Sequence, residues 1–415
     1  MQLEFGYGQS VQIVDVPDRN LLTELKANPV KHIRKGTEAV RYALEHPVGS
    51  AKLKDMVTSG QRVAVITSDI SRPLPSYEIL PVILDALYEA GVSPENITVI
   101  FGLGSHRRQT EEEKRCLVGE RCYNEVQCVD SDSEDFVRMG ITANGTPVDV
   151  TRVVAEADFR ICLGNIEFHY FAGYSGGAKA LMPGVSTLEA IQKNHRLMVH
   201  DRTFSGNLAD NPLRQDIEEA GKIAAIDFIV NVVLDEKKKI VYCVAGDAVK
   251  AHRAGCIYLD QMYRITIPER ADIVIVSQGG APKDANLYQT QKALDNAKHA
   301  VRKGGTIILI GACNEGLGSA KFEQWLFEAQ NPHDLIERVE NDFELGGHKA
   351  AAMAMVLENV QIDLVSEMDA DLVRRIFLNP APSAQNAFEK AMTRYGSNAS
   401  VIAMPHGGAT LPIIN

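Results

Sequence analysis

The sequence predicts an α/β protein built mainly from parallel sheets, and two features support this prediction. Short runs of apolar and β-branched residues alternate with stretches of helical periodicity, such as 77–90 and 286–301. Because these runs are continuously apolar, they indicate strands that are covered by helices on both faces of a sheet. The predicted strands are 62–67, 96–101, 158–163, 227–234, 272–277, 306–310 and 400–404.

The chain of 415 residues is long enough for two or three domains. The proline-containing segment 264–272 precedes a second series of strands and helices, so we place a boundary there. We expect an N-terminal catalytic and cofactor-binding domain over 1–266 and a smaller α/β domain over 267–395, with the active site between them. The segment 396–415 could pack back on the first domain.

Composition and charge exclude several classes of protein. With 45% hydrophobic and 23% charged residues, the chain is typical of globular proteins. The 43 basic and 54 acidic residues give a net charge of −11 without a basic block, so neither nucleic acid nor a membrane surface is an expected partner.

The sequence also shows no targeting signal and no closely spaced pair of cysteines. The first ten residues show no basic region leading into an apolar core, and no apolar run approaches the ~18 residues that span a bilayer. Seven cysteines without CxxC spacing indicate reduced thiols. We therefore expect a cytoplasmic protein.

Polar, glycine-containing turns follow the first predicted strands, where ligands bind in open α/β sheets. His106 and His169 end two of these turns. Imidazoles titrate near neutrality, so the two could form an acid/base pair, although either could be structural. Arg72 is held extended by Pro73 and could clamp a carboxylate or pair with Asp69.

The segment after His169 nearly matches several motifs. A P-loop over 173–180 fails at two of its four fixed positions, and the turn 102–107 lacks the third glycine of a dinucleotide site. The sequence GYSGG does match a nucleophile elbow, so a serine hydrolase using Ser175 is an alternative function. However, the preceding strand is predicted to end about a dozen residues earlier.

Lys179 lies in the same glycine-rich segment, in which residues 168–187 include no Asp or Glu. A lysine without nearby carboxylates can have a lowered pKa and act as a nucleophile or anchor a cofactor. It could equally be a surface lysine or bind a phosphate.

A helix is predicted after this segment. Ser186 and Glu189 have the spacing of a capping box. His195 then falls on the same apolar face as Leu188, which fits either a core histidine or a ligand. His200, five residues later, points in another direction and cannot complete a helical metal pair with it.

Taken together, these motifs resemble the nickel-dependent lactate racemase family. The family pattern is an Asp-x-x-Arg-Pro turn, a Gly-Ser-His-Arg turn, a His and a Lys ten residues apart, and a His sixteen residues after the Lys. The second domain of the family contributes Asn-Leu-Tyr-Gln-x-x-Lys. The corresponding residues here are Asp69, Arg72, Pro73, Gly104, Ser105, His106, Arg107, His169, Lys179, His195, Asn286, Leu287, Tyr288, Gln289 and Lys292.

The resemblance implies a cofactor, the nickel-pincer nucleotide (pyridinium-3,5-bisthiocarboxylic acid mononucleotide nickel). Lys179 would attach it covalently and His195 would complete the nickel coordination. The remaining residues expected to bind the nucleotide and its phosphate are Asp69, Gly102, Gly104, Ser105 and Arg107. Enzymes that synthesise this cofactor are implied as partners.

The resemblance also implies a racemase or epimerase that inverts the C2 centre of a 2-hydroxy acid by reversible hydride transfer to the cofactor. His106 and His169 would act as bases on opposite enantiomers, and Arg72 would hold the carboxylate. Further substrate contacts would come from Tyr288, Gln289 and Lys292. An inactive nucleotide-binding module is the alternative outside enzymes.

One departure from the family concerns the substrate. Lactate enzymes of the family place a tryptophan of the second domain against the substrate methyl group. The only tryptophan here, Trp325, lies in a helical segment, and the nearest equivalent stretch is 346–349, with His348 and Lys349. We therefore expect a substrate that is bulkier or more polar than lactate.

Overall fold

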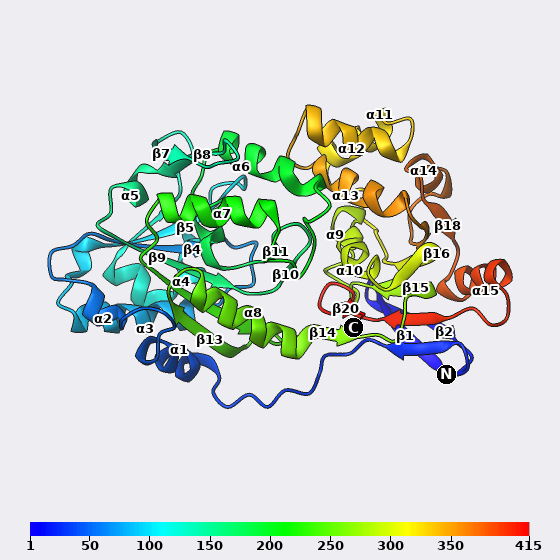
Figure 1. Ribbon diagram of the computed structural model, residues 1–415, viewed down its shortest axis with the longest axis horizontal. Helices are drawn as coiled ribbons and strands as arrows, with labels where there is room; N and C mark the ends of the chain where they lie inside the picture. Colours follow the sequence, from blue (N-terminus) through cyan, green and yellow to red (C-terminus); the bar gives the residue numbers. More distant parts are fainter. Residues whose placement is uncertain (415) are drawn as a thin grey trace. The chain divides into compact units, whose positions relative to one another are not determined.

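The computed structural model describes residues 1–414, which form two compact units (Figure 1). The central unit is Val30–Gln261, and the terminal unit combines Met1–Pro29 with the chain from Met262 onward. The change of unit at Met262 lies close to the predicted boundary at 266. Both units contain parallel strands and helices, which confirms the predicted fold class.

The central unit is built on a six-stranded sheet with the strand order β13-β12-β9-β4-β5-β6. All neighbouring pairs are parallel except β12 and β13. The strands are β4 (Val63–Ser68), β5 (Ile97–Gly102), β6 (Gln127–Asp130), β9 (Phe159–Asn165), β12 (Phe228–Leu234) and β13 (Ile240–Gly246). Two hairpins accompany the sheet, β7 (Phe136–Ile141) with β8 (Pro147–Thr151) and β10 (Phe168–His169) with β11 (Gly173–Tyr174).

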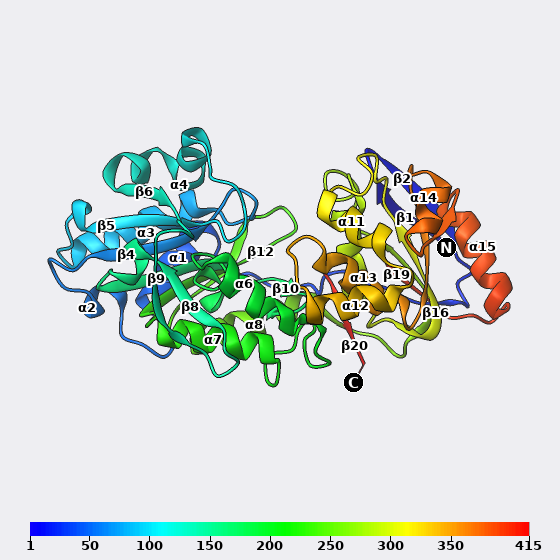
Figure 2. The same ribbon diagram turned by 90° about the horizontal axis from the view of Figure 1, so that it is seen from above.

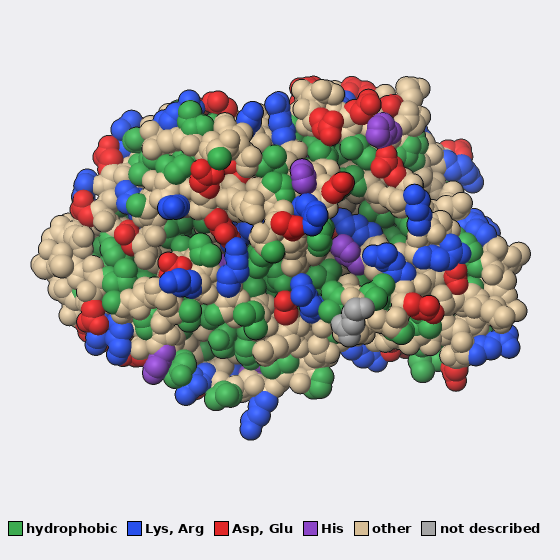
Figure 3. Space-filling view, viewed as in Figure 1, with side chains coloured by type: hydrophobic (Ala, Val, Ile, Leu, Met, Phe, Trp, Pro, Cys, Tyr) green, Lys and Arg blue, Asp and Glu red, His purple; other side chains and the backbone are tan. Residues whose placement is uncertain are grey.

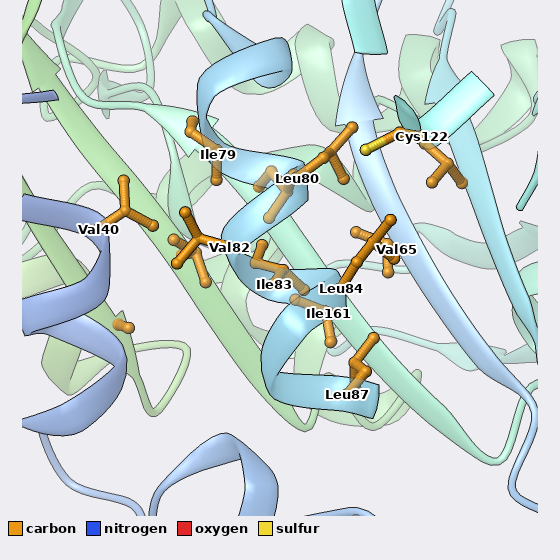
Figure 4. Packing of buried hydrophobic residues seen from close by; sticks show 14 of the residues in the cluster. Val40, Val65, Ile79, Leu80, Val82, Ile83, Leu84, Leu87, Cys122 and Ile161 are labelled. Carbon is orange, nitrogen blue, oxygen red and sulfur yellow. The ribbon is translucent and has the colours of Figure 1, made fainter. Parts of the chain in front are cut away.

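Helices cover both faces of this sheet, with α3 and α4 on one side and α7 and α8 on the other (Figures 1 and 2). Apolar side chains of α3, such as Leu80 and Leu87, pack toward Val65 of β4 and Ile161 of β9 (Figure 4). The helices are α1 (Gly36–Glu45), α2 (Leu53–Met56), α3 (Ser76–Glu89), η1 (Pro94–Asn96), α4 (Glu111–Glu125), α5 (Arg152–Ala155), η2 (Gly177–Ala180), α6 (Leu188–His195), η3 (Arg196–Val199), α7 (Pro212–Ile223) and α8 (Lys250–Tyr263).

The terminal unit contains a six-stranded parallel sheet with the order β18-β17-β16-β15-β19-β3. Its strands are β3 (Leu21–Glu24), β15 (Ala271–Ser277), β16 (Val301–Ile310), β17 (Gln361–Val365), β18 (Asn379–Ala381) and β19 (Val401–Met404), with the pairs β1 (Gln2–Tyr7)/β2 (Ser10–Asp15) and β14 (Arg264–Thr266)/β20 (Leu411–Ile413). Its helices are α9 (Leu287–Thr290), η4 (Gln291–Ala293), α10 (Leu294–Ala297), α11 (Ala320–Glu328), α12 (Pro332–Asn341), α13 (His348–Leu357), α14 (Ala370–Arg375) and α15 (Ala384–Tyr395).

The two ends of the chain differ from the predicted division. Residues 1–29, assigned to the first domain, belong to the terminal unit because β3 pairs with β19 and the β1–β2 hairpin packs in that unit's core. Residues 396–414 belong to the terminal unit. There, β19 lies between β15 and β3 in the terminal sheet.

The predicted strands are all present, although the one expected over 306–310 begins at Val301. The helical stretch expected over 286–301 is interrupted: α9, η4 and α10 follow one another, and β16 then begins. These short helices carry the residues predicted to bind substrate from the second domain.

Three further features can be compared with the sequence: the distribution of charge, the length and apolar character of the helices, and the state of the cysteines. Acidic and basic side chains are interspersed over the face drawn in Figure 3. Among residues 1–414, no helix has the length and apolar character needed to cross a bilayer. All seven cysteines are free thiols.

Candidate active site

Three adjacent parallel strands, β9, β4 and β5, bring the predicted site turns to one edge of the central sheet. The turn after β4 carries Asp69 and Arg72, and the turn after β5 carries His106. The β10–β11 hairpin and η2, which carry His169 and Lys179, follow β9. Parallel strands end at the same edge, so segments far apart in the sequence become neighbours.

The exposed side chain of His106 forms a pair with the buried carboxylate of Asp69. Nδ1 of His106 lies 2.5 Å from Oδ2 of Asp69, and the other carboxylate oxygen accepts hydrogen bonds from the Ser71 amide at 3.0 Å and hydroxyl at 2.6 Å. Burial raises the pKa of Asp69, but the bonds from His106 and Ser71 and the charges of His106 and Arg72 outweigh it, so the pKa is lowered. An ionised Asp69 fixes the His106 proton on Nδ1 and leaves Nε2 as a base.

Asp69 thus bonds to His106, and its contact with the nucleotide stays a prediction. Within residues 1–414, the exposed Arg72 guanidinium makes no ion pair, whereas its amide donates to the Asp69 carbonyl at 3.2 Å. The ion pair considered as an alternative for Arg72 is therefore not formed. Its side chain suits a carboxylate ligand.

Arg214 of α7 forms hydrogen bonds with the glycine-rich turn that contains Lys179. The guanidinium of this fully buried arginine donates to the carbonyls of Tyr174 at 3.3 Å and Gly176 at 3.2 Å. Gly177 has φ +62°, and a Cβ there would meet Arg214 at 2.6 Å, so only glycine fits. The turn is thus fixed in position by a buried cation.

The Lys179 amine lies close to His169. Its Nζ is 3.4 Å from Nε2 of His169, while Nδ1 of His169 accepts the Ala172 amide at 3.3 Å. Burial of the amine, followed by the positive charges of Arg72 and Arg214, lowers the pKa of Lys179 well below 10.5. Glu167 opposes this effect but is outweighed. The side chain as a whole is half-buried, and a lowered pKa favours the neutral form of the amine, which is the nucleophilic one.

His195 is the last residue of α6 and is buried, as predicted, but the start of this helix differs from the prediction. The N-cap is Thr187, whose hydroxyl accepts the Ala190 amide, whereas the Ser186 hydroxyl donates to the Leu181 carbonyl. The helix therefore begins one residue later than a Ser186 cap would place it. Leu188, expected on the buried face, is its first residue and is exposed.

Phe171 joins the predicted residues into one cluster. Its buried ring makes edge contacts with the rings of His169 (4.4 Å between centroids) and His195 (4.7 Å). The Lys179 ammonium lies 5.4 Å from the same ring. Sequence reasoning did not identify Phe171, and its only local signal is its place between His169 and Lys179. The predicted base His169, the predicted attachment site Lys179 and the predicted nickel ligand His195 thus lie around a single aromatic ring.

The residues predicted to bind the phosphate have other contacts. A Cβ at Gly102 would meet Gly184 at 3.1 Å, and the Gly104 amide donates to the Gly184 carbonyl at 2.8 Å. These glycines therefore allow the turn after β5 to pack against the loop before α6. Ser105 is exposed, and Arg107 makes a bidentate ion pair with Glu113 at 2.7 and 2.8 Å. Their contact with a phosphate stays a prediction.

Ser175 does not have the environment of a hydrolase nucleophile. Its hydroxyl donates to the Asn165 carbonyl at 2.7 Å and accepts the Glu167 amide at 2.9 Å. His252 contacts the Ser175 carbonyl oxygen at 2.8 Å rather than the hydroxyl. The hydroxyl therefore holds the turn together and is not paired with a base.

In the terminal unit, the predicted substrate residues lie on consecutive short helices. Asn286 caps α9 by accepting the Gln289 amide at 3.2 Å. Tyr288 and Gln289 are half-buried, and Lys292 is exposed. The ammonium of Lys349 lies 3.5 Å from the Tyr288 ring centroid and 3.4 Å from the Tyr288 carbonyl oxygen. A second cation thus accompanies these residues, whose role toward substrate stays a prediction.

Trp325 and His348 are core residues of the terminal unit. Trp325 is fully buried and donates from Nε1 to Glu344 at 2.9 Å, and a Cβ at Gly347 would meet its ring at 2.2 Å. Burial, together with Lys349, lowers the pKa of His348 to about 3, so this imidazole is neutral. Trp325 supports the helices around it and is not displayed for a ligand.

Comparison with known proteins decides the family. Residues 7–206 match the lactate racemase N-terminal domain, and residues 267–411 match the lactate racemase C-terminal domain. The chain belongs to the lactate racemase family. It is accordingly an isomerase of the racemase type.

Relatives of the lactate racemase family match almost the whole chain. The lactate racemase of Thermoanaerobacterium thermosaccharolyticum is 31% identical over 98% of this chain and 97% of the relative, and that of Lactiplantibacillus plantarum is 32% identical over 98% of each. The apoprotein structure of the former gives a TM-score of 0.91 at 30% identity, covering 100% of both chains. A Thermotoga maritima protein with a TM-score of 0.65 at 18% identity, covering 94% of this chain and 100% of its own, shows the same fold alone.

Proposed function

We propose that this racemase inverts the C2 centre of a 2-hydroxy acid, with a nickel-pincer nucleotide bound covalently to Lys179. The main support is the cluster around Phe171, which brings an amine of lowered pKa, an imidazole at 3.4 Å from it and the buried His195 together. Membership of the lactate racemase family gives the reaction class. Cofactor-synthesising enzymes are the proposed protein partners.

The side chains present fit this cofactor. Lys179 offers an amine whose lowered pKa favours the neutral, nucleophilic form, and His195 offers a nitrogen donor near the same ring. In the part of the chain that the structure describes, no three His, Cys, Asp or Glu residues form a metal site of their own. Nickel held by one imidazole would therefore take its other ligands from the cofactor, and mixed nitrogen and sulfur ligands suit nickel(II).

When bound, the cofactor would supply a reversible hydride acceptor for the Cα–H bond of the substrate. The chain itself supplies the proton transfers. His106, oriented by Asp69, presents Nε2 as a base for the hydroxyl proton of one enantiomer. His169, beside Lys179, would protonate the carbonyl oxygen of the planar 2-keto acid to form the other enantiomer, and the roles reverse in the opposite direction.

Substrate positioning is assigned to residues outside this proton relay. Arg72 would hold the carboxylate in a bidentate pair, because its exposed guanidinium makes no ion pair within residues 1–414. Tyr288, Gln289 and Lys292 of the terminal unit are the further proposed contacts.

Chiral chromatography tests this function. Protein produced together with the cofactor-synthesising enzymes should convert each pure enantiomer of its 2-hydroxy acid into a racemic mixture, or into the epimer for a sugar acid. Failure to interconvert any 2-hydroxy acid, in protein shown by mass to carry the cofactor, would refute the proposal and favour a binding module.

The preferred substrate is expected to be bulkier or more polar than lactate. Trp325 is enclosed in the core of the terminal unit, and Lys349 places a cation beside Tyr288. Malate or 2-hydroxyglutarate would suit the cation, and a sugar acid such as gluconate would meet the expectation of a bulkier and more polar substrate. Assays of lactate, malate, 2-hydroxyglutarate and gluconate should give the lowest kcat/KM for lactate. A highest kcat/KM for lactate would contradict this expectation.

His195 is expected to be the protein ligand of nickel. His195→Ala should lose most of the nickel and the activity, because the variant removes the buried imidazole that α6 places against Phe171. His200→Ala is the matched control: the exposed His200 ring accepts the Arg202 amide at 3.1 Å, and this variant should keep both the nickel and the activity. Metal analysis of the purified variants distinguishes them, and the reverse pattern would mean that the wrong histidine was chosen.

A further inference from the structure

Asn194, the neighbour of His195 on α6, is fully buried and connects this helix to α7. Its Nδ2 lies 2.8 Å from Oδ2 of Asp216 and 3.3 Å from the carbonyl oxygen of Leu213. Its Oδ1 lies 3.1 Å from Nδ1 of His195. One amide side chain thus links a buried carboxylate to the imidazole.

The orientation of the Asn194 amide follows from its partners. A carboxylate and a backbone carbonyl only accept hydrogen bonds, so the NH₂ group must face Asp216 and Leu213. The amide oxygen then faces His195 and can only accept. Nδ1 of His195 must therefore carry a proton, and in the neutral ring Nε2 has the lone pair.

Asp216 is itself held in place by the turn between β7 and β8. The hydroxyls of Thr142 and Thr146 donate to its two carboxylate oxygens at 2.5 and 2.7 Å. The Thr142 hydroxyl accepts the Thr146 amide at 3.1 Å, which directs its own proton to the carboxylate. With the Asn194 bond, the fully buried Asp216 accepts three hydrogen bonds and cannot rotate without losing them.

We propose that Asn194 and Asp216 are positioning residues that hold His195 in the Nδ1–H tautomer, so that Nε2 is the nitrogen offered to nickel. The nickel part of this inference rests on the proposed function. Metal-binding histidines commonly donate their second ring N–H to a fixed acceptor, and loss of that acceptor weakens metal binding about 10–100-fold. Here the acceptor is a neutral amide whose orientation a carboxylate determines, and this amide fixes the tautomer of the imidazole.

The tautomer can be measured in the protein without cofactor, by ¹⁵N NMR of protein labelled at histidine. His195→Ala identifies the His195 resonances by their disappearance. In the wild type, we expect a protonated Nδ1 and an unprotonated Nε2 at neutral pH. A wild-type His195 protonated on Nε2 alone would overturn the inference before any positioning variant is made.

Two nearly isosteric variants test the two positioning residues. Asp216→Asn gives position 216 an NH₂ group, which allows the Asn194 amide to turn and present its own NH₂ to His195. Asn194→Leu removes the acceptor altogether. Both should shift His195 toward the Nε2–H tautomer, whereas Gln215→Leu, at the exposed neighbouring position on α7, should not. An unchanged tautomer in both folded variants would overturn the inference.

Nickel retention provides the second readout. In protein produced with the cofactor-synthesising enzymes, Asp216→Asn and Asn194→Leu should retain nickel about 10–100-fold less tightly against a chelator, with the mass adduct on Lys179 unchanged. A shifted tautomer with unchanged nickel retention would overturn the link between this tautomer and the metal. A wild-type protein with the expected tautomer but no adduct would instead refute the proposed function and leave the tautomer result intact.

Discussion

Lys179→Arg is expected to abolish racemisation and to leave the protein without covalently bound nucleotide. Arginine keeps the positive charge and much of the length of the side chain, but a guanidinium is not an amine nucleophile at neutral pH. The variant would therefore distinguish a requirement for covalent attachment from a requirement for positive charge at position 179. Lys193→Ala is the matched control, because Lys193 is an exposed lysine on α6 and should be dispensable. Chiral assay and intact mass of both variants check this expectation.

The pH dependence of Lys179 provides a test that needs no cofactor. Because burial and then Arg72 and Arg214 lower its pKa, the amine should lose its proton at a lower pH than an ordinary lysine near 10.4. Acylation of Lys179 in the apoprotein should therefore rise with pH and level off early. A rate that keeps rising to about pH 10 would mean that the amine is charged at neutral pH, contrary to the role proposed for it.

His106→Ala and His169→Ala are each expected to lower racemisation by about 10²–10⁴, the usual range for loss of a general base. Each half-reaction needs one imidazole in the proton-accepting role, so neither histidine can replace the other. His46→Ala, on the exposed end of α1, should retain wild-type activity. Measuring both directions from pure enantiomers is the check. A variant that racemised at the wild-type rate would show that its histidine is structural.

The arrangement of the candidate site could be predicted to a large extent from the order of strands and turns. Asp69, Arg72 and His106 follow neighbouring apolar strands, and parallel strands end at one edge, so their proximity follows from the fold class. The absence of acidic residues around Lys179 allowed a lowered pKa without deciding it, and burial together with Arg72 and Arg214 lowers that pKa. Local sequence patterns were sufficient where the order of strands and turns along the chain determines which residues lie close together.

Contacts between distant turns could not be predicted in this way. The bond between His106 and Asp69 depends on how two loops meet, and Phe171 resembles any other aromatic residue in the sequence. The pairing of β3 with β19 joins segments almost 400 residues apart, and no periodicity encodes such a partner. At α6, the Ser186 hydroxyl bonds to the Leu181 carbonyl in the preceding loop, and the adjacent Thr187 hydroxyl provides the cap instead.

Peptide mass spectrometry of active wild-type enzyme, produced with the cofactor-synthesising enzymes, tests the central claim most directly. Trypsin cannot cleave after a modified lysine, so covalent attachment predicts one peptide spanning 161–193 that carries the mass of the nucleotide. Active enzyme that instead yields the unmodified peptides 161–179 and 180–193 in full amount would contradict the attachment of the cofactor to Lys179.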